Sequence, residues 1–226
     1  MRSISHTASL RAFARAGLIV AFVAAVGAGT AAELAGQTGG ESRRDEWQRP
    51  DDVLDAMGAR PGGRVADVGA GAGYFTFKMA ARVGPTGKVF AEDIRDSELD
   101  TIRQRKAREN LTQIEVVLGE TDDPRLPEGL DGILVFNAYH EFREYDAMLA
   151  GLFRALKPGG RLVVIDRTAD DEGDRDAYFA MHAITAAAVQ AEAERHGFTL
   201  SGQPAKLDDP SERRDMFFLV FERPRT

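Results

Sequence analysis

The feature that most constrains this chain is a glycine-rich turn at the end of an apolar stretch. Residues 65–76 read Val-Ala-Asp-Val-Gly-Ala-Gly-Ala-Gly-Tyr-Phe-Thr. Gly69, Gly71 and Gly73 alternate with alanines, and Asp67 stands two positions before the first glycine. A backbone without Cβ atoms can turn sharply and let a ligand approach its N–H groups closely. The pattern therefore predicts a strand, a tight turn and a helix start, with a ligand beside the turn.

Two further segments place this turn in an α/β fold. Residues 89–94 (Val-Phe-Ala-Glu-Asp-Ile) form a second apolar stretch that carries acids near its end. Asp93 follows Gly73 by about 20 residues, the separation at which a second parallel strand returns its carboxylate to a ribose. Strand alternation predicts that Glu92 points away from Asp93. Residues 156–166 combine a Lys-Pro-Gly-Gly helix stop with another buried strand, and strands alternating with helices predict a parallel sheet.

Together these segments resemble the S-adenosylmethionine-dependent methyltransferases of the Rossmann-like class. The resemblance implies a doubly wound α/β fold whose mostly parallel, seven-stranded sheet has a reversed last strand. It also implies S-adenosyl-L-methionine as the cofactor, with the ribose hydroxyls on Asp93. The other residues that it assigns to the cofactor are Asp67, Gly69, Gly71 and Gly73 at the methionine end, with Tyr74 beside them.

The loop at residues 119–124 lies on the cofactor side of the predicted sheet. In the resembled class an acid in this region receives the adenine amino group, which makes Asp122 the predicted residue and Asp123 its alternative. An Asp-Pro turn without a ligand explains the loop equally well. A tight turn without a ligand is likewise the alternative for the glycines. A nicotinamide-dependent oxidoreductase would share the turn and Asp93, but Asp67 and the glycine spacing disfavour it.

The methyl acceptor is expected after the predicted fourth strand, at residues 137–142 (Asn-Ala-Tyr-His-Glu-Phe). His140, Glu141 and Phe142 match the His-Asp-Trp element of the plant phenolic O-methyltransferases, whose histidine removes the acceptor's proton. The resemblance implies His140 as general base toward a small-molecule hydroxyl, with Glu141 orienting the ring or the substrate. A hydroxyl acceptor needs such a base, and imidazole titrates in the useful range. The alternative is that His140 only packs in the cleft wall.

The composition fits one compact domain with a leader. The chain has 226 residues, of which 43% are hydrophobic and 29% are charged, and its net charge is −7. An acidic chain lacks the basic field that non-specific nucleic-acid binding requires, so no nucleic-acid partner is predicted. The absence of cysteine excludes disulfides, thiolate metal sites and cysteine nucleophiles, and no metal site is predicted. The oligomeric state does not follow from the sequence.

Residues 1–32 have the order of a secretory signal: a basic start, a short apolar core and small residues. We expect cleavage after Ala31 or Ala32, export to the periplasm, and no stable membrane span afterwards. An uncleaved membrane anchor is the alternative, because the apolar core is marginal in length for a bilayer. Residues 33–49 are predicted to be a linker and 50–226 the methyltransferase domain. Export leaves open how the cofactor is supplied, so an exported, non-catalytic module that keeps the cofactor pocket is a further alternative.

Overall fold

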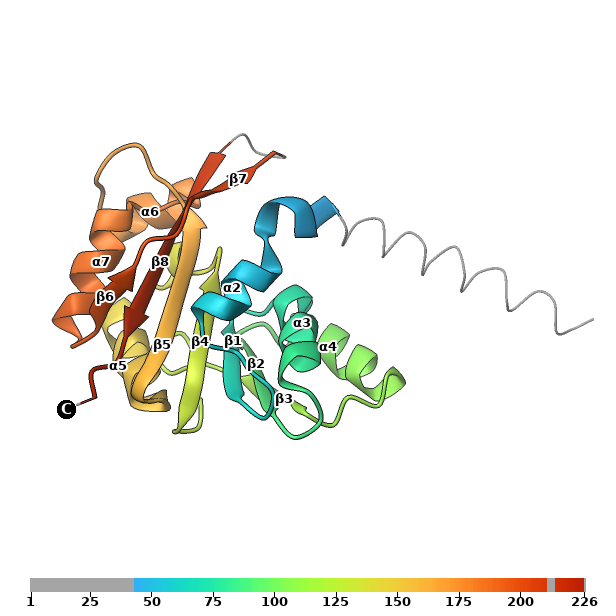
Figure 1. The fold of residues 1–226 in the computed structure, drawn as a ribbon. Coiled ribbons are helices and arrows are strands. Elements are labelled where there is room, and N and C mark those ends of the chain that lie inside the picture. Colours follow the sequence, from blue (N-terminus) through green and yellow to red (C-terminus); the bar gives the residue numbers. More distant parts are fainter. Residues whose placement is uncertain (1–42, 211–213, 226) are drawn as a thin grey trace, which may run out of the picture. The chain divides into compact units, whose positions relative to one another are not determined.

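The structure is a computed structural model that describes residues 43–210 and 214–225, so the predicted leader lies outside the described residues. Strands and helices alternate along the chain (Figure 1). The strands are β1 (Arg64–Val68), β2 (Lys88–Asp93), β3 (Ile114–Leu118), β4 (Leu130–Phe136), β5 (Leu156–Arg167), β6 (Thr199–Gly202), β7 (Leu207–Asp209) and β8 (Arg214–Glu222). The helices are α2 (Pro50–Ala56), α3 (Tyr74–Val83), α4 (Asp96–Arg108), the 3-10 helix η1 (Tyr139–Glu141), α5 (Tyr145–Ala155), α6 (Arg175–Met181) and α7 (Ala186–Arg195).

The strands form one mixed sheet with the order β3-β2-β1-β4-β5-β8-β6, and β7 pairs with β8. β1 to β5 pair in parallel, whereas β8 runs antiparallel to β5. The prediction of a doubly wound, mostly parallel sheet with a reversed last strand is confirmed. Within the described residues the sheet has 8 strands instead of the predicted seven, because the short β7 pairs with the first residues of β8.

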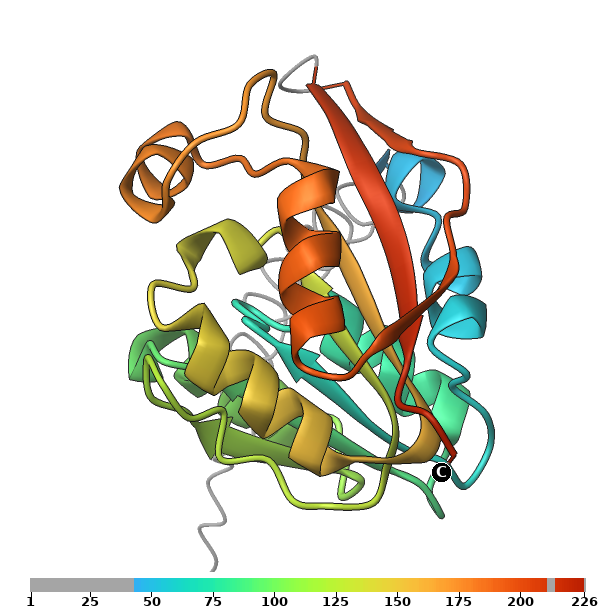
Figure 2. The same cartoon turned by 90° about the vertical axis from the view of Figure 1, so that its left-hand side faces the viewer.

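Helices cover both faces of the sheet. The apolar residues of α2, α3 and α4 pack on one face, and those of α5, α6 and α7 pack on the other. In Figure 2, α5 and α7 lie in front of the sheet, while α6 projects beyond them at the end where η1 lies. Val65 of β1 belongs to the first core, and its neighbours Ala66 and Val68 belong to the second. Burial on both faces explains why the central strands are continuously apolar in sequence.

The first described residues form a short helical segment ahead of α2. Residues 43–48 are helical, although they belong to the predicted linker. Trp47 packs against Phe136 at the end of β4, with 6.4 Å between the ring centroids. The tryptophan thus packs against the sheet at the end of β4. No helix among residues 43–210 and 214–225 has the length and apolarity needed to cross a membrane.

The order of the strands places a ligand site at one edge of the sheet. β2 lies on one side of β1, and β4 lies on the other. In open α/β sheets, ligands bind beyond the carboxyl ends of the strands at such a reversal of strand order. The segments that follow β1, β2, β3 and β4 therefore determine what the site contains.

Candidate active site

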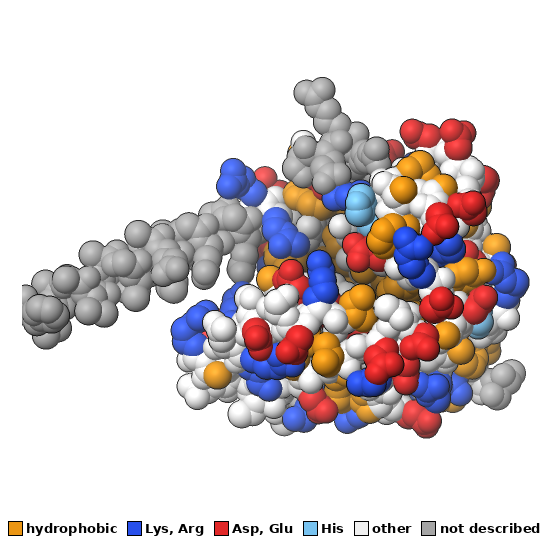
Figure 3. Space-filling model, turned by 180° about the vertical axis from the view of Figure 1, so that it is seen from behind, with side chains coloured by type: hydrophobic (Ala, Val, Ile, Leu, Met, Phe, Trp, Pro, Cys, Tyr) orange, Lys and Arg blue, Asp and Glu red, His pale blue; other side chains and the backbone are white. Residues whose placement is uncertain are grey.

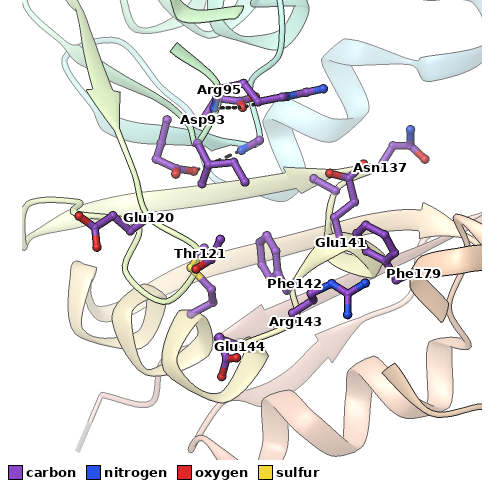
Figure 4. Close-up of a pocket in the computed structure, with 15 residues that line it drawn as sticks. Asp93, Arg95, Glu120, Thr121, Asn137, Glu141, Phe142, Arg143, Glu144 and Phe179 are labelled. Carbon is purple, nitrogen blue, oxygen red and sulfur yellow. Dashed lines mark hydrogen bonds and ion pairs between the residues drawn. The ribbon is translucent and has the colours of Figure 1, made fainter. Parts of the chain in front are cut away.

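A cleft of about 430 Å³ lies at this edge of the sheet (Figure 4). Its volume is within the range of small-molecule sites. The residues that line it are Gly69 after β1, Glu92 and Asp93 at the end of β2, Ile94 and Arg95 after β2, Glu120 and Thr121 after β3, Asn137, Ala138, Glu141, Phe142, Arg143, Glu144 and Met148 after β4, and Phe179 of α6. The cleft thus has one end formed by β1 and β2 and another formed by η1 and α6.

The glycine turn at the first end has the backbone that its sequence predicts. Gly69, Gly71 and Gly73 have φ angles of 69°, 52° and 88°, which side-chain-bearing residues rarely adopt. A Cβ on Gly69 would lie 2.6 Å from Ala138, and one on Gly73 would lie 2.8 Å from Phe77. A Cβ on Gly71 would meet nothing within 4 Å. Packing therefore requires the outer two glycines, while Gly71 faces open space. Of the three, Gly69 lines the cleft and the other two do not.

Asp93 joins this turn to the end of β2. Its buried carboxylate accepts a hydrogen bond from the Gly71 N–H at 2.9 Å and another from the Arg95 N–H at 2.9 Å. The Arg95 guanidinium adds an ion pair at 3.3 Å. A carboxylate has about four acceptor positions, so it can still accept a hydroxyl. Asp93 lines the cleft, and its role in ribose binding stays a prediction.

The loop predicted to contact adenine lines the cleft only in part. Ile94 follows Asp93, is 50% exposed and lines the cleft, so it offers an apolar surface to a flat ring. Glu120 and Thr121 also line the cleft, whereas Asp122 is exposed and does not. The loop after β3 is thus in the expected place, and the adenine role of Asp122 stays a prediction. Sequence reasoning missed Ile94, although an apolar residue after a strand-ending acid was its signal.

Asp67 and Tyr74 support the turn from behind and do not line the cleft. Asp67 is 3% exposed and accepts a hydrogen bond from the Thr76 hydroxyl at 2.6 Å, which ties β1 to α3. Burial raises the pKa of Asp67 to about 6. The Tyr74 hydroxyl donates to Asp45, which ties α3 to the N-terminal helical segment.

Glu92 is a buried acid that the sequence assigned to the far side of β2. It lines the cleft together with Asp93, and its Oε2 accepts from the Gly69 N–H at 3.3 Å. The lack of a side chain at Gly119 makes room for it, because a Cβ there would lie 1.8 Å from Oε1. That Oε1 is buried and has no hydrogen-bond partner among the described residues. Burial is the main cause that raises the pKa of Glu92 to about 8, and the charges of Asp93 and Asp67 add to it.

This raised pKa predicts a pH-dependent stability. Between about pH 4.5 and 8 the unfolded chain releases the Glu92 proton while the folded chain keeps it, so the free energy of unfolding falls as pH rises. Each unit of pKa difference corresponds to about 1.4 kcal/mol. Glu92→Gln should therefore be more stable than the wild type at pH 8 and similar to it at pH 5, measured by denaturant unfolding. The exposed Glu115→Gln is the control, and an equal pH dependence in wild type and Glu92→Gln would contradict the assignment.

His140 lies at the other end of the cleft, paired with a buried acid. Asp166, at the end of β5, is fully buried and accepts from His140 Nδ1 at 2.8 Å and from the His140 backbone N–H at 3.0 Å. It also accepts from the Arg167 N–H at 2.7 Å. Because a carboxylate can only accept, Nδ1 carries the proton and Nε2 keeps a lone pair. Sequence reasoning missed this role of Asp166, although its position at a strand end was a signal.

The imidazole does not itself line the cleft, since the His140 side chain is only 1% exposed. Nε2 faces Glu141, whose Oε1 is 3.8 Å away and whose side chain is 47% exposed. The His182 ring covers the imidazole edge-on, with 5.6 Å between centroids. Figure 4 shows Glu141 beside Phe142 and Phe179, across the cleft from Asp93. Glu141 therefore stands between the cleft and the buried His140–Asp166 pair.

Asn137 completes this end of the cleft. It follows β4 with a left-handed φ of 54°, an uncommon conformation that asparagine tolerates better than most residues. Its Oδ1 is buried and has no hydrogen-bond partner among the described residues. A buried acceptor of this kind in a cleft wall is suited to bind a ligand donor.

Comparisons with known proteins agree with the fold. The "Methyltransferase domain" family model matches residues 59–205. The ubiquinone/menaquinone biosynthesis C-methyltransferase UbiE of Vibrio campbellii is 36% identical over 123 residues, which are 53% of this chain and 46% of that protein. The chain thus spans about half the length of this curated relative.

Solved structures show the same architecture. A SAM-dependent methyltransferase from Aquifex aeolicus superposes with a TM-score of 0.67 at 24% identity, covering 80% of this chain and 92% of that one. The cyclase SpnF superposes with a TM-score of 0.67 at 15% identity, covering 79% of this chain and 82% of that one. The fold therefore accommodates more than one reaction, and the site residues must decide between them.

S-adenosylmethionine fits the cofactor end of this cleft. Asp93 offers a buried carboxylate, and Ile94 offers an exposed apolar surface. Gly71, whose N–H donates to Asp93, leaves open space for a close approach. The family match covers well over half of the chain and includes all three residues. The chain therefore belongs to the methyltransferase domain family, and its fold is that of a solved S-adenosylmethionine-dependent methyltransferase.

Proposed function

We propose that the protein methylates a hydroxyl group of a small, largely apolar acceptor bound between η1 and α6. The observation that carries this proposal is the buried Asp166–His140 pair behind Glu141, because such a pair is suited to take up a proton. Phe142, Phe179 and Met148 offer the acceptor an apolar wall. On the face drawn in Figure 3, basic and acidic side chains are interspersed, which is compatible with a small-molecule acceptor.

The chemistry requires alignment before anything else. S-adenosylmethionine, when bound, supplies a methyl group on a positively charged sulfur that a lone pair can attack in line with the S–C bond. The glycine turn and Asp93 would hold this cofactor, with Ile94 against its adenine. The unpartnered Asn137 Oδ1 is placed to accept a hydrogen bond from a donor group of the acceptor. These residues fix the angle of attack, and the remaining task is the removal of a proton.

The proton has a route from the cleft to His140. The acceptor hydroxyl donates to the exposed Glu141 carboxylate. His140 Nε2 lies 3.8 Å from Glu141 Oε1, and rotation of the half-exposed Glu141 side chain brings the two atoms within hydrogen-bond distance, so that the proton passes to the imidazole. Asp166 holds the ring in the tautomer that can accept this proton and stabilises the imidazolium that forms. His140 thus acts as a base through Glu141 and does not contact the acceptor.

C-methylation is the second candidate, since the name of the Vibrio campbellii relative describes a C-methyltransferase. Loss of a proton from a ring hydroxyl raises the electron density on neighbouring ring carbons as well as on the oxygen. The same residues therefore serve both reactions. The identity of the methylated atom has to be read from the product.

The test is turnover with a panel of phenols, catechols and aliphatic alcohols in the presence of S-adenosylmethionine. We expect acceptor-dependent formation of S-adenosylhomocysteine and a methylated product whose methyl group is located by NMR. Binding of S-adenosylhomocysteine with no turnover of any acceptor would support the non-catalytic module instead. Binding of NAD in preference to S-adenosylhomocysteine, measured calorimetrically, would support the oxidoreductase.

Export is a separate proposal that rests on the order of residues 1–32. We expect the mature protein to begin near Ala32 or Glu33 and to fractionate with the periplasm. N-terminal sequencing of the protein from its native host decides this. An intact Met1 in a membrane fraction would show that the leader remains as an anchor.

A further inference from the structure

Three potential metal ligands meet at the acceptor end of the cleft, although their sequence positions gave no sign of a metal site. One donor atom from each of His140, Glu141 and His182 lies within 4.8 Å of the other two. We infer that these side chains form a binding site for a divalent transition-metal ion, Zn²⁺ in the first place. The site regulates the proposed reaction, because a metal ion on His140 Nε2 occupies the lone pair that would accept the proton. Metal binding itself does not depend on that reaction.

The spacing of the donors is close to what zinc requires. Bonds of about 2.1 Å in a tetrahedral arrangement place ligand atoms about 3.4 Å apart. His140 Nε2 and Glu141 Oε1 are 3.8 Å apart, and the widest separation in the set is within 4.8 Å. Glu141 is half-exposed and His182 is exposed, so both can close the remaining gap by rotation of their side chains.

The surroundings of His140 are suited to a bound cation. Its Nε2 lone pair faces a carboxylate oxygen at 3.8 Å, which is too far for a hydrogen bond. Both atoms carry lone pairs, so a cation bound to the two of them at once would be stabilised by each. Asp166 supplies the outer contact that metal-bound histidines usually have, because it accepts from Nδ1 at 2.8 Å and so directs Nε2 toward the ion.

His182 reaches the site through an unusual backbone. It caps the end of α6 with a φ of 50°, in the left-handed region where glycine or asparagine is the usual residue. Its N–H donates to the Phe179 carbonyl at 3.3 Å, which fixes this conformation. A histidine at this position places an imidazole over His140. A glycine or asparagine in its place would leave only His140 and Glu141 as ligands.

The donor set selects the class of ion. Two imidazoles and one carboxylate suit zinc and the later transition metals, whereas Mg²⁺ and Ca²⁺ prefer oxygen ligands only. Three protein ligands leave one coordination position of a tetrahedral ion open. Because Glu141 lines the cleft, that open position would face the cleft. A water molecule or an acceptor oxygen could fill that position.

Binding is measured by competition with a chromophoric zinc chelator, using the full mature chain with an affinity tag that contains no histidine. We expect one Zn²⁺ per chain and no competition by Mg²⁺. Co²⁺ should give visible d–d absorption bands, which report its coordination without any enzyme assay. Absence of stoichiometric Zn²⁺ binding would overturn the inference.

Two variants and one control locate the site. His182→Asn removes a ligand but keeps a residue that tolerates the left-handed backbone. It should weaken the affinity for Zn²⁺ by about tenfold or more. Asp166→Asn should weaken it by about 10–100-fold through the lost outer contact. His196→Ala removes a histidine that pairs with Asp146 on α5, and this control variant should bind Zn²⁺ with the affinity of the wild type. Equal affinity in the wild type and His182→Asn would exclude His182 as a ligand and overturn the three-residue site.

The activity measurement separates this inference from the proposed function. In a metal-free buffer His182→Asn should keep the wild-type rate, and Zn²⁺ should inhibit the wild type at concentrations that leave His182→Asn active. Zinc binding without any methyl transfer would refute the proposed function alone. Equal inhibition of both proteins by Zn²⁺ would refute regulation through this site.

Discussion

His140→Ala is expected to lower kcat for methyl transfer by about 10²–10⁴-fold, the usual contribution of a general base. The affinity for S-adenosylhomocysteine should stay nearly unchanged, because the cofactor end of the cleft is formed by β1 and β2. The side chain is 1% exposed, so its loss also removes packing, and circular dichroism must show that the variant folds. The measurement is steady-state kinetics in metal-free buffer together with calorimetric titration. A His140→Ala enzyme that retains most of its kcat would refute the base assignment.

A double-mutant cycle tests the route of the proton. If the proton passes through Glu141 to His140, then Glu141→Gln should cause a similar loss, and the double variant should lose little more than either single variant. Additive losses would show that the two residues act independently. Asp166→Asn should also lower kcat, since an amide can present its NH₂ group to Nδ1 and so favour the wrong tautomer.

Gly71→Val is expected to abolish binding of S-adenosylhomocysteine. A Cβ at this position meets nothing within 4 Å in the protein, so the added methyl groups would occupy the space that the methionine end of the cofactor needs. Asp93→Ala should weaken binding by about 2 kcal/mol or more, about 30-fold, through the loss of charge-assisted bonds to the ribose. Isothermal titration calorimetry measures both effects. Unchanged affinity in both variants would contradict the assigned cofactor site.

Each of these variants has a structural control. Gly58 has a φ of 74°, and a Cβ added there would also meet nothing within 4 Å, so Gly58→Val carries the same kind of backbone strain away from the cleft. Wild-type affinity in Gly58→Val together with lost binding in Gly71→Val would assign the effect to the ligand space. Asp93→Asn keeps an oxygen that can accept from the Gly71 N–H and should therefore bind better than Asp93→Ala.

The cofactor end of the site was predictable because its signals are local. The turn after β1 requires glycines at fixed positions, and the carboxylate at the end of β2 follows from strand length and parallel pairing. The structure brings Gly71 and Asp93 into contact across 22 residues. The alternation rule did not reveal that Glu92 also lines the cleft, because side chains from both faces of a strand can reach a cleft at the strand's end.

The acceptor end was less predictable because its contacts are tertiary. Asp166 and His140 are 26 residues apart, and only the pairing of β4 with β5 brings them together. His182 joins them from a short helix whose position depends on its packing against η1. The strand β7 was missed for a similar reason, since three residues form it only where β8 offers an edge. The local sequence pattern carries no information about such tertiary contacts.

The N-terminal helical segment, residues 43–48, changes where the functional unit begins. Asp45 accepts a hydrogen bond from the Tyr74 hydroxyl and forms a salt bridge with Lys78. Trp47 packs against Phe136. A truncation that starts at Pro50, the boundary suggested by sequence alone, would strip these contacts from the helix that follows the glycine turn. Shortened forms for expression, and domain fusions built from this fold, should therefore retain the segment upstream of α2.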